Sequence, residues 1–311
     1  MIAEKIYTKP ATVAEALELA ATYRDDFGYV AGGTDVLVNK FQGTRDFGCL
    51  IDITGIDELK QVSCVGDTLR IGALVRLDEL KKHPEIREYL SALILAAGEV
   101  ASPMLRKAAT LGGNVLCENR CSFFNQSEWW REAVGYCLKC EGDICIATGG
   151  RKACFSKFVS DTAPVLIAAG ARIELQDIDS YRIEELENIY TGDGIHPRNI
   201  SETALLTQIM IPVQAGLKIA FRKLRPREAV DFTSLTTAVA LNPKGELRIV
   251  IGGMDPKPVV LAGLFSDDHE ALIKKALAKT RTVDNDYYSR KYRREMLRVF
   301  LEDSFEEVGK G

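Results

Sequence analysis

The sequence predicts an α+β protein of two domains, residues 1–214 and 215–311. A chain of 311 residues is long enough for about two hydrophobic cores. Before residue 214, short strand patterns alternate with amphipathic helical patterns. After it, three strand patterns follow one another and two helical patterns come last. No low-complexity segment or long linker interrupts either part.

The first elements lie in residues 11–38. A helical pattern covers 11–23, where Thr12 and Glu15 have the spacing of a capping box. Residues 29–31 predict a short buried strand, and 36–38 predict a helix or a second strand. Glycines separate these two elements, which is typical of a tight turn.

Strands and helices continue to the expected domain boundary. The stretches 50–56 (LIDITGI) and 69–77 (LRIGALVRL) predict strands, and a helix is expected through 77–82. Apolar residues at helical spacing predict one helix over 86–101. Residues 160–177 predict a helix followed by a strand, and Pro212 ends a further strand that begins near 204.

The second part has a simpler pattern. Residues 216–226, 235–242 and 246–254 predict three consecutive strands. Two helical patterns follow, near 268–279 and 286–302. Consecutive strands followed by helices are typical of an α+β domain.

The composition excludes several classes of function. Hydrophobic residues make up 46% and charged residues 27% of the chain, and the net charge is −4. This balance argues against a nucleic-acid partner, which favours a strongly basic domain. No signal-peptide pattern begins the sequence, and no apolar run reaches the roughly 18 residues of a membrane span. We therefore expect a cytoplasmic protein with neither nucleic acid nor membrane as a partner.

Two glycine pairs are candidate ligand-binding turns: Gly32–Gly33 in VAGGTDV and Gly112–Gly113 in TLGGNV. Adjacent glycines allow positive φ angles and a close approach to a ligand, and their N–H groups can hold a diphosphate. Thr34, Thr110 and Asn114 add polar side chains beside them. A tight turn without a ligand is the alternative at either pair. The fingerprint G-x-G-x-x-G is absent, so a nicotinamide-type site is not indicated.

Six of the eight cysteines lie within the 38 residues 117–154, here called the cysteine segment. They are Cys117, Cys121, Cys137, Cys140, Cys145 and Cys154. In a reducing compartment such a cluster indicates a metal site or catalysis rather than disulfides. Four thiolates suit a [4Fe–4S] cluster or a zinc ion. Zinc sites favour repeated C-x2-C pairs, however, and the segment has one such pair and no histidine. A small core of inert buried cysteines is the third interpretation.

Aromatic residues accompany these cysteines. Burial near a metal centre would exclude water and so influence its reduction potential. We therefore expect five side chains to shield a cluster: Phe123, Phe124, Trp129, Trp130 and Tyr136.

Five motifs occur in a specific order: VAGGTDVLV, ATLGGNV, SDTAPVLIA, LLTQIMIP and FRKLRPREAVDF. In this order the chain resembles, over essentially its whole length, the FAD-binding subunits of the molybdenum hydroxylase (xanthine dehydrogenase) family. The resemblance implies an FAD-binding fold of the vanillyl-alcohol-oxidase/PCMH type in residues 1–214, with subdomains of about 1–55 and 56–214. It also implies a C-terminal antiparallel sheet with helices, similar to that of the CO dehydrogenase flavoprotein.

The resemblance implies where FAD binds. Residues 31–35 and 110–114 would wrap the diphosphate, and Asp161 would bind the ribityl or ribose region. Leu206 would pack near the isoalloxazine, and Lys223 would lie near the ring, where a cation stabilises the anionic reduced flavin. A solvated lysine at a strand end is the alternative for Lys223. The full expected set is Tyr29, Val30, Ala31, Gly32, Gly33, Thr34, Asp35, Val36, Thr110, Leu111, Gly112, Gly113, Asn114, Asp161, Leu206 and Lys223.

Most members of this family lack the insertion that this chain carries at about 116–158. The stretches 120–131 (RCxxxNQSEWWR) and 135–139 (GYCLK) resemble the insertion in the flavin subunits of 4-hydroxybenzoyl-CoA reductases, which holds an additional [4Fe–4S] cluster. The match implies four ligands: Cys121, Cys137, Cys145 and Cys154. Cys117 and Cys140 are then surplus and would be the first alternatives as ligands. Cys49 and Cys64 are expected in the core.

The resemblance implies an electron-transfer subunit of an oxidoreductase, with no catalytic residue of its own. Electrons from a low-potential donor such as ferredoxin would pass through the [4Fe–4S] cluster and FAD to a small [2Fe–2S] subunit and a large molybdopterin subunit. The complex would be a dimer of heterotrimers that reduces 4-hydroxybenzoyl-CoA to benzoyl-CoA.

Three other functions remain open. The complex could act on another hydroxyarene or a hydroxylated N-heterocycle, because substrate choice lies in the molybdenum subunit. A stand-alone flavoprotein oxidase would leave the cysteine segment unexplained. A zinc-stapled binding module would contain zinc without iron, sulfide or flavin.

Overall fold

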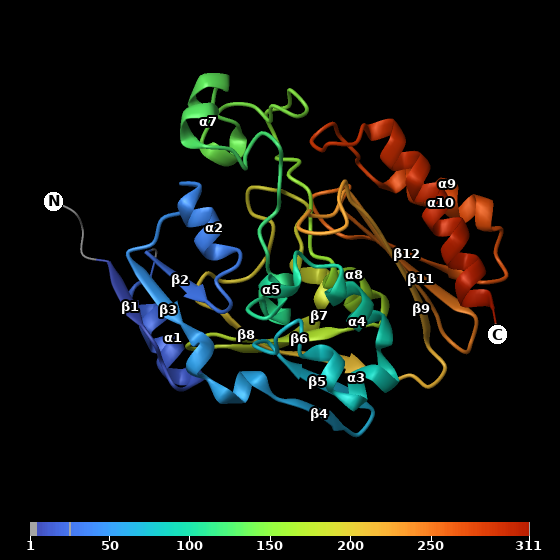
Figure 1. The fold of residues 1–311 in the computed structure, drawn as a ribbon, viewed down its shortest axis with the longest axis horizontal. Helices are drawn as coiled ribbons and strands as arrows, with labels where there is room; N and C mark the ends of the chain where they lie inside the picture. Colours follow the sequence, from blue (N-terminus) through green and yellow to red (C-terminus); the bar gives the residue numbers. More distant parts are fainter. Residues whose placement is uncertain (1–4, 25, 311) are drawn as a thin grey trace.

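A computed structural model describes residues 5–24 and 26–310, which form three β-sheets with helices packed on them (Figure 1). The first sheet is parallel, in the strand order β1-β3-β2. Its strands are Ile6–Thr8 (β1), Cys49–Asp52 (β3) and Phe27–Val30 (β2). Helix α1 (Val13–Thr22) packs its apolar face against β3.

The cap of α1 is the predicted one. The Glu15 N–H donates to Thr12 Oγ1 at 3.2 Å, and the Glu15 carboxylate accepts from the Ala11 N–H at 2.8 Å. Two of the free N–H groups at the start of the helix region therefore find acceptors. After β2, residues 36–41 form helix α2 (Val36–Phe41) rather than a strand.

The second sheet is antiparallel, in the order β4-β5-β8-β6-β7. Its strands are Val62–Val65 (β4), Thr68–Gly72 (β5), Leu205–Pro212 (β8), Arg172–Gln176 (β6) and Tyr181–Glu185 (β7). Four helices lie near it: Pro84–Tyr89 (α3), Ser91–Gly98 (α4), Pro103–Arg106 (α5) and Leu111–Val115 (α6). Helix α8 (Thr162–Ala168) is buried along its whole length, because it lies between this sheet and the third one (Figure 1).

The third sheet is antiparallel, in the order β12-β11-β10-β9. Its strands are Val259–Leu264 (β12), Glu246–Gly252 (β11), Leu235–Leu241 (β10) and Lys218–Leu224 (β9). In β10, Ala238 and Ala240 face the central core with α8, whereas Val239 faces the core beneath α10. Helices α9 (His269–Lys279) and α10 (Arg290–Gly309) cover this outer face (Figure 1). Because both faces of this sheet are covered by other elements, the residues of β10 do not alternate between apolar and polar.

The α+β fold class is confirmed, but several element predictions were wrong in detail. The helix expected over 86–101 is two helices, because Leu90 leaves the helical conformation at φ −150° and ψ 53°. The helix expected through 77–82 is only a 3-10 turn at Leu80–Lys82. Strands β1, β4, β7 and β12 were not predicted. The last helix begins at Arg290 and continues to Gly309, beyond the expected end.

The remaining elements are short. The 3-10 turns besides Leu80–Lys82 are Ile53–Gly55, Asp57–Lys60, Leu138–Cys140 and Leu186–Ile189. The cysteine segment leaves the framework after α6, contains helix α7 (Glu128–Val134), and returns before α8; α7 projects beyond the sheets on the side of α2 (Figure 1). Within 5–24 and 26–310, no helix combines the length and apolar character needed to cross a membrane.

Candidate functional site

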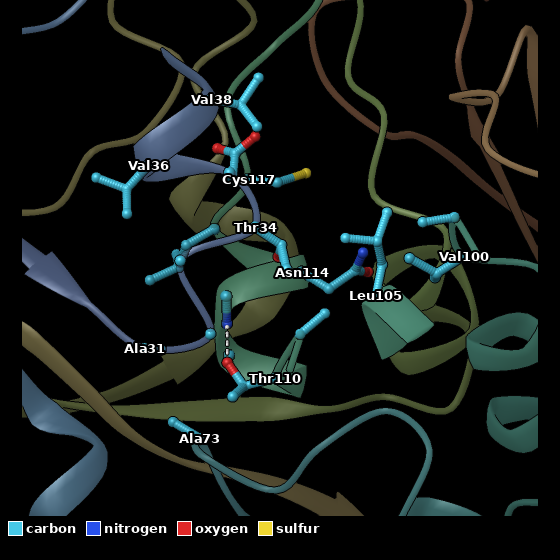
Figure 2. Close-up of a pocket in the computed structure, with 18 of the residues that line it drawn as sticks. Ala31, Thr34, Val36, Val38, Ala73, Val100, Leu105, Thr110, Asn114 and Cys117 are labelled. Atoms are coloured by element: carbon cyan, nitrogen blue, oxygen red, sulfur yellow. Dashed lines mark hydrogen bonds between the residues drawn. The ribbon is translucent and has the colours of Figure 1, made fainter. Parts of the chain in front are cut away.

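A cleft of about 400 Å³ brings the two glycine loops together (Figure 2). One wall is the loop after β2, residues 31–36. The opposite wall includes α6 and the segment 159–161. Residues 204–206 before and in β8, and the loop 230–232 between β9 and β10, complete the lining. Sequence segments far apart in the chain therefore form one binding site.

The first loop presents unpaired N–H groups. Gly33 has φ +69°, and a Cβ on Gly32 would lie 2.1 Å from the carbonyl oxygen of Ala108, so only glycine fits there. Among the described residues, the N–H groups of Gly32, Gly33, Thr34 and Asp35 have no acceptor. Successive free N–H groups of this kind can bind a diphosphate.

The second loop is fixed against the sheet. Thr110 Oγ1 accepts from the Gly113 N–H at 3.2 Å (dashed in Figure 2), and the Gly112 N–H donates to the Ala73 carbonyl at 2.9 Å. A Cβ on Gly112 would lie 2.7 Å from that of Ala73, so the absence of a side chain permits this contact. The loop therefore has a rigid position in one wall of the cleft.

Asn114 connects the second loop to the segment that carries Asp161. Its Oδ1 accepts from Thr162 Oγ1 at 2.7 Å and from Ser160 Oγ at 2.9 Å. The side-chain oxygen of Asn114 is thus used in contacts within the protein. These contacts fix the position of loop 110–114 relative to Asp161 in the cleft.

Asp161 is a buried carboxylate at the cleft. Its Oδ2 accepts from Lys223 Nζ at 2.7 Å, while Oδ1 has no partner among the described atoms. Burial raises the pKa of Asp161 to about 6, and the Lys223 ammonium opposes this increase. An unpaired buried carboxylate oxygen that faces a cleft can accept a hydrogen bond from a ligand hydroxyl.

Lys223 lies behind Asp161. Its ammonium also donates to the carbonyls of Glu99 at 2.9 Å and Asp231 at 3.3 Å, and the side chain is buried. It does not line the cleft itself. The alternative of a solvated lysine at a strand end is therefore wrong, and any influence of this cation on a ligand passes through Asp161.

Thirteen of the sixteen expected FAD residues line the cleft. They are Tyr29, Ala31, Gly32, Gly33, Thr34, Asp35, Val36, Thr110, Gly112, Gly113, Asn114, Asp161 and Leu206. The other three are Val30, at the end of β2, Leu111, which is in the central core, and Lys223.

The sequence did not indicate several other lining residues. They include Val100–Ala101, Leu105, Cys117, Arg120 and the loop 230–232. Ala101 has φ 45°, which is unusual for a residue with a side chain. Figure 2 shows that Cys117, Val100 and Leu105 reach the cleft from separate segments. Two of these regions carried a sequence signal: the insertion includes Cys117 and Arg120, and the motif FRKLRPREAVDF ends with residues 230–232.

The cysteine segment divides its six thiols into two groups. The four expected ligands are buried, with exposures of 9% for Cys121, 8% for Cys137, and 5% for both Cys145 and Cys154. Cys117 and Cys140 are partly exposed, and Cys117 lines the cleft instead. Outside the segment, Cys49 is buried as expected, but Cys64 is exposed, so its assignment to the core was wrong.

Three of the four buried sulfurs have hydrogen-bond donors. Cys154 Sγ accepts from the Ser156 N–H at 3.4 Å and lies 3.5 Å from Ser156 Oγ. Backbone N–H groups at 123 and 124 donate to Cys121, although burial dominates and raises its pKa to about 11. The Cys140 thiol and backbone N–H groups at 139 and 140 stabilise the Cys137 thiolate and lower its pKa to about 6. Donors to sulfur are a feature of iron–sulfur ligands.

Within 5–24 and 26–310, no group of three or more Cys, His, Asp or Glu side chains is arranged to hold a metal ion, so the expected [4Fe–4S] ligation is not seen in the positions of these sulfurs. The expected aromatic shield is only partly present. Phe124 and Phe123 pack with Cys121 and Cys137, whereas Trp129 is 75% exposed and Tyr136 is 41% exposed.

A buried carboxylate ties the cysteine segment to the framework. Glu118 forms ion pairs with Arg198 at 2.5 Å, Lys139 at 3.3 Å and Arg45 at 3.4 Å. Burial would raise its pKa, but the three cations, Arg198 foremost, lower it to about 2. Glu118 is therefore ionised at neutral pH, and its charge joins three separate segments.

The fold and the cleft define a mixed α/β FAD-binding domain with a C-terminal antiparallel sheet. Residues 2–214 match the family described as the FAD binding domain in molybdopterin dehydrogenase. The chain belongs to this family, and it is the FAD-binding subunit of an oxidoreductase of the molybdenum hydroxylase family.

Relatives and solved structures agree with this assignment. The aldehyde oxidoreductase FAD-binding subunit of Escherichia coli (strain K12) is 31% identical over 81% of this chain and 82% of its own length. The nicotinate dehydrogenase FAD-subunit of Eubacterium barkeri is 25% identical over 75% of this chain and 67% of its own. Carbon monoxide dehydrogenase from Hydrogenophaga pseudoflava superposes with a TM-score of 0.77 at 20% identity, covering 99% of this chain and 98% of that one. At this identity the superposition shows the fold alone.

Proposed function

We propose that this subunit passes electrons between a low-potential donor, such as a ferredoxin, and partner redox subunits, through a [4Fe–4S] cluster in the cysteine segment and through FAD. The burial of Cys121, Cys137, Cys145 and Cys154, which are the four cysteines that the resemblance names, carries the proposal. Cys121 interacts electrostatically with Cys137 and Cys154, and Cys154 interacts with Cys145, so the four buried sulfurs are neighbours that one cluster could use together.

FAD would occupy the cleft. The free N–H groups of residues 32–35 suit its diphosphate, and the unpaired oxygen of Asp161 suits a ribityl or ribose hydroxyl. Leu206 offers an apolar surface for the ring. When bound, the flavin can accept and donate electrons either one at a time or in pairs. The protein holds the cofactor and sets the electrostatic environment of its ring. Lys223 and Asp161 form a buried pair with little net charge beside that site.

The cysteine segment would hold the cluster with Cys121, Cys137, Cys145 and Cys154. Hydrogen bonds to the sulfurs of Cys121, Cys137 and Cys154 would stabilise their thiolate forms. Phe124 would exclude water from one side. A bound [4Fe–4S] cluster supplies one-electron transfer, with a potential set by these hydrogen bonds and by solvent exposure.

The partners would be a small [2Fe–2S] subunit and a large molybdopterin subunit, assembled as a dimer of heterotrimers. The names of the two relatives, which describe an FAD-binding subunit and an FAD-subunit, support a multi-subunit enzyme. We propose that the complex reduces 4-hydroxybenzoyl-CoA. Two electrons and two protons break the phenolic carbon–oxygen bond, with benzoyl-CoA and water as products. The motifs of 120–131 and 135–139 support this substrate.

A second candidate has the opposite electron flow. The E. coli relative is an aldehyde oxidoreductase subunit and the E. barkeri relative a nicotinate dehydrogenase subunit. In that case substrate oxidation at molybdenum would reduce FAD, and the cysteine segment would deliver electrons to an acceptor. The same ligands would serve both directions.

The test uses the complex purified without oxygen. Reduced ferredoxin should reduce its FAD rapidly, and Cys137→Ser should slow this step by at least about 100-fold, because the proposed entry point is lost. Cys64→Ser, at an exposed cysteine outside the cysteine segment, is the matched control and should retain the rate. Turnover of 4-hydroxybenzoyl-CoA with reduced ferredoxin favours the first candidate. Turnover limited to aldehydes or nicotinate with an oxidised acceptor favours the second, and equal rates in both variants would refute the entry point.

A further inference from the structure

Arg120 is a buried cation at the junction of the cleft and the cysteine segment. It is 5% exposed, lines the cleft, and directly precedes Cys121. Among the described residues that line the cleft, it is the only lysine or arginine; the other charged lining residues are Asp35, Asp161 and Asp231.

Three contacts fix the guanidinium of Arg120. One terminal nitrogen pairs with Asp35 Oδ1, and the other donates to Asn39 Oδ1 at 3.0 Å. The guanidinium carbon lies 4.7 Å from the centre of the Phe232 ring, a cation–π arrangement. The side chain is therefore held by α2 and its preceding loop on one side, and by the loop between β9 and β10 on another.

The protein leaves part of the Arg120 guanidinium without acceptors. Of its five N–H groups, two donate to Asp35 and Asn39, and the buried Nε–H has no acceptor among the described atoms. Buried N–H groups without a partner in the protein usually have a ligand or water in the functional state. Because Arg120 lines the cleft, a ligand there can accept from an N–H that the protein leaves free.

The ligand's chemistry can be inferred from the neighbouring loop. Asp35, the anchor of Arg120, belongs to the loop 31–36 whose N–H groups are free. Its carboxylate also accepts from the Glu118 N–H at 3.1 Å and from Asn39 Nδ2 in α2 at 3.3 Å, so it joins the cysteine segment to α2. An anion bound to this loop therefore lies beside a fixed guanidinium. Guanidinium and phosphate oxygens form strong hydrogen bonds.

We propose that Arg120 binds the diphosphate of FAD through a guanidinium N–H that the protein leaves free, and that it is the cationic side chain of the cleft. The inference rests on the proposed position of the diphosphate at loop 31–35. It makes Arg120 a ligand of the flavin, although the residue belongs to the insertion that carries the cysteines. FAD binding and the position of the first proposed cluster ligand are then linked by one peptide bond.

The experiment measures FAD affinity of the purified chain by quenching of flavin fluorescence. Arg120→Gln should weaken FAD binding about 10- to 100-fold, as expected for loss of a charged hydrogen bond. Arg120→Lys keeps the charge but loses the planar set of guanidinium N–H donors, so it should also weaken FAD binding, though less than Arg120→Gln. The matched control is Arg151→Gln, at an exposed arginine of the same segment, and it should have no effect.

Phosphorus NMR of bound FAD separates a direct contact from a structural role. The diphosphate resonances should shift in Arg120→Gln and stay unchanged in Arg151→Gln. If Arg120→Gln fails to fold, judged by circular dichroism without flavin, Arg120→Lys decides. Weaker FAD binding together with shifted diphosphate resonances in Arg120→Lys supports the proposal, and unchanged affinity with unchanged resonances overturns it. Unchanged affinity in folded Arg120→Gln also overturns it.

Iron analysis of the same preparations keeps the two proposals distinct. A wild-type chain without iron, in which FAD affinity still depends on Arg120, would refute the cluster and leave the diphosphate contact intact. A wild-type chain that contains iron, together with an Arg120→Gln variant that binds FAD normally, would refute the diphosphate contact and leave the cluster proposal intact.

Discussion

Glu118 is the buried charge that most directly connects the cysteine segment to the rest of the protein, so its removal is an informative perturbation. Glu118→Gln keeps the shape of the side chain and removes its charge. Lys139, with a side chain 7% exposed, and Arg198, 18% exposed, would then lose their carboxylate partner. Breaking a buried ion pair from one side is strongly destabilising, because the remaining charge stays buried.

The pKa of Glu118 gives the magnitude. Burial would raise the pKa, but Arg198, Lys139 and Arg45 lower it from 4.5 to about 2. At about 1.4 kcal/mol for each pH unit, this difference corresponds to about 3 kcal/mol of stability at neutral pH. A depressed pKa contributes stability that is present above the unfolded value of 4.5 and is lost as the pH falls towards 2.

Urea unfolding of the purified chain measures this effect. Glu118→Gln should lower the free energy of unfolding by about 3 kcal/mol at pH 7, and the gap to the wild type should narrow by about 2 kcal/mol at pH 3. Glu79→Gln is the control, because its surface pair with Arg76 at 3.9 Å should contribute less than about 0.5 kcal/mol. A Glu118→Gln chain as stable as the wild type at pH 7, or a gap independent of pH, would refute the reasoning.

Three further predictions concern the cleft and the cysteine segment. Gly32→Ala should lower the free energy of unfolding by about 1–3 kcal/mol and weaken FAD binding, because its Cβ would lie 2.1 Å from the Ala108 carbonyl oxygen. The control Gly98→Ala, with open space around the new Cβ, should change the free energy of unfolding by less than about 0.5 kcal/mol. Equal effects of the two substitutions in urea unfolding and FAD titration would contradict this prediction. Asp161→Asn should cost less than Glu118→Gln in urea unfolding at pH 7, because burial raises the pKa of Asp161 to about 6 and Lys223 keeps two carbonyl acceptors, and a larger loss than in Glu118→Gln would contradict this. Trp129→Ala should leave both stability and iron content unchanged, because Trp129 is 75% exposed, and loss of iron would restore its expected role as a shield.

The sequence was most informative where burial is periodic or continuous. The buried strand β10 and the buried helix α8 both appear as apolar runs, so their existence could be predicted. The break between α3 and α4 could not, because Leu90 is buried and keeps the apolar spacing across the break. Strand β7 is mostly exposed and rich in charge, so hydrophobic pattern gave no signal for it.

The candidate site likewise has features that the sequence predicted and features that it did not. The glycine pairs indicated the two loops, because positive φ and close packing need that residue type. Their meeting in one cleft came only from the family resemblance. Arg120 pairs with Asp35, which is 85 residues earlier in the chain, and with the ring of Phe232, and no local pattern encodes such contacts. The burial of four of six clustered cysteines is likewise a property of the fold rather than of the spacing.

The most direct test of the account is the cofactor content of the chain purified without oxygen. Iron, sulfide, zinc and FAD should be measured together, with electron paramagnetic resonance of the reduced protein. The account predicts about four irons and four sulfides for each FAD, without zinc, and a cluster signal that Cys137→Ser abolishes. FAD without iron, or zinc in place of iron, would contradict the proposed role of the cysteine segment.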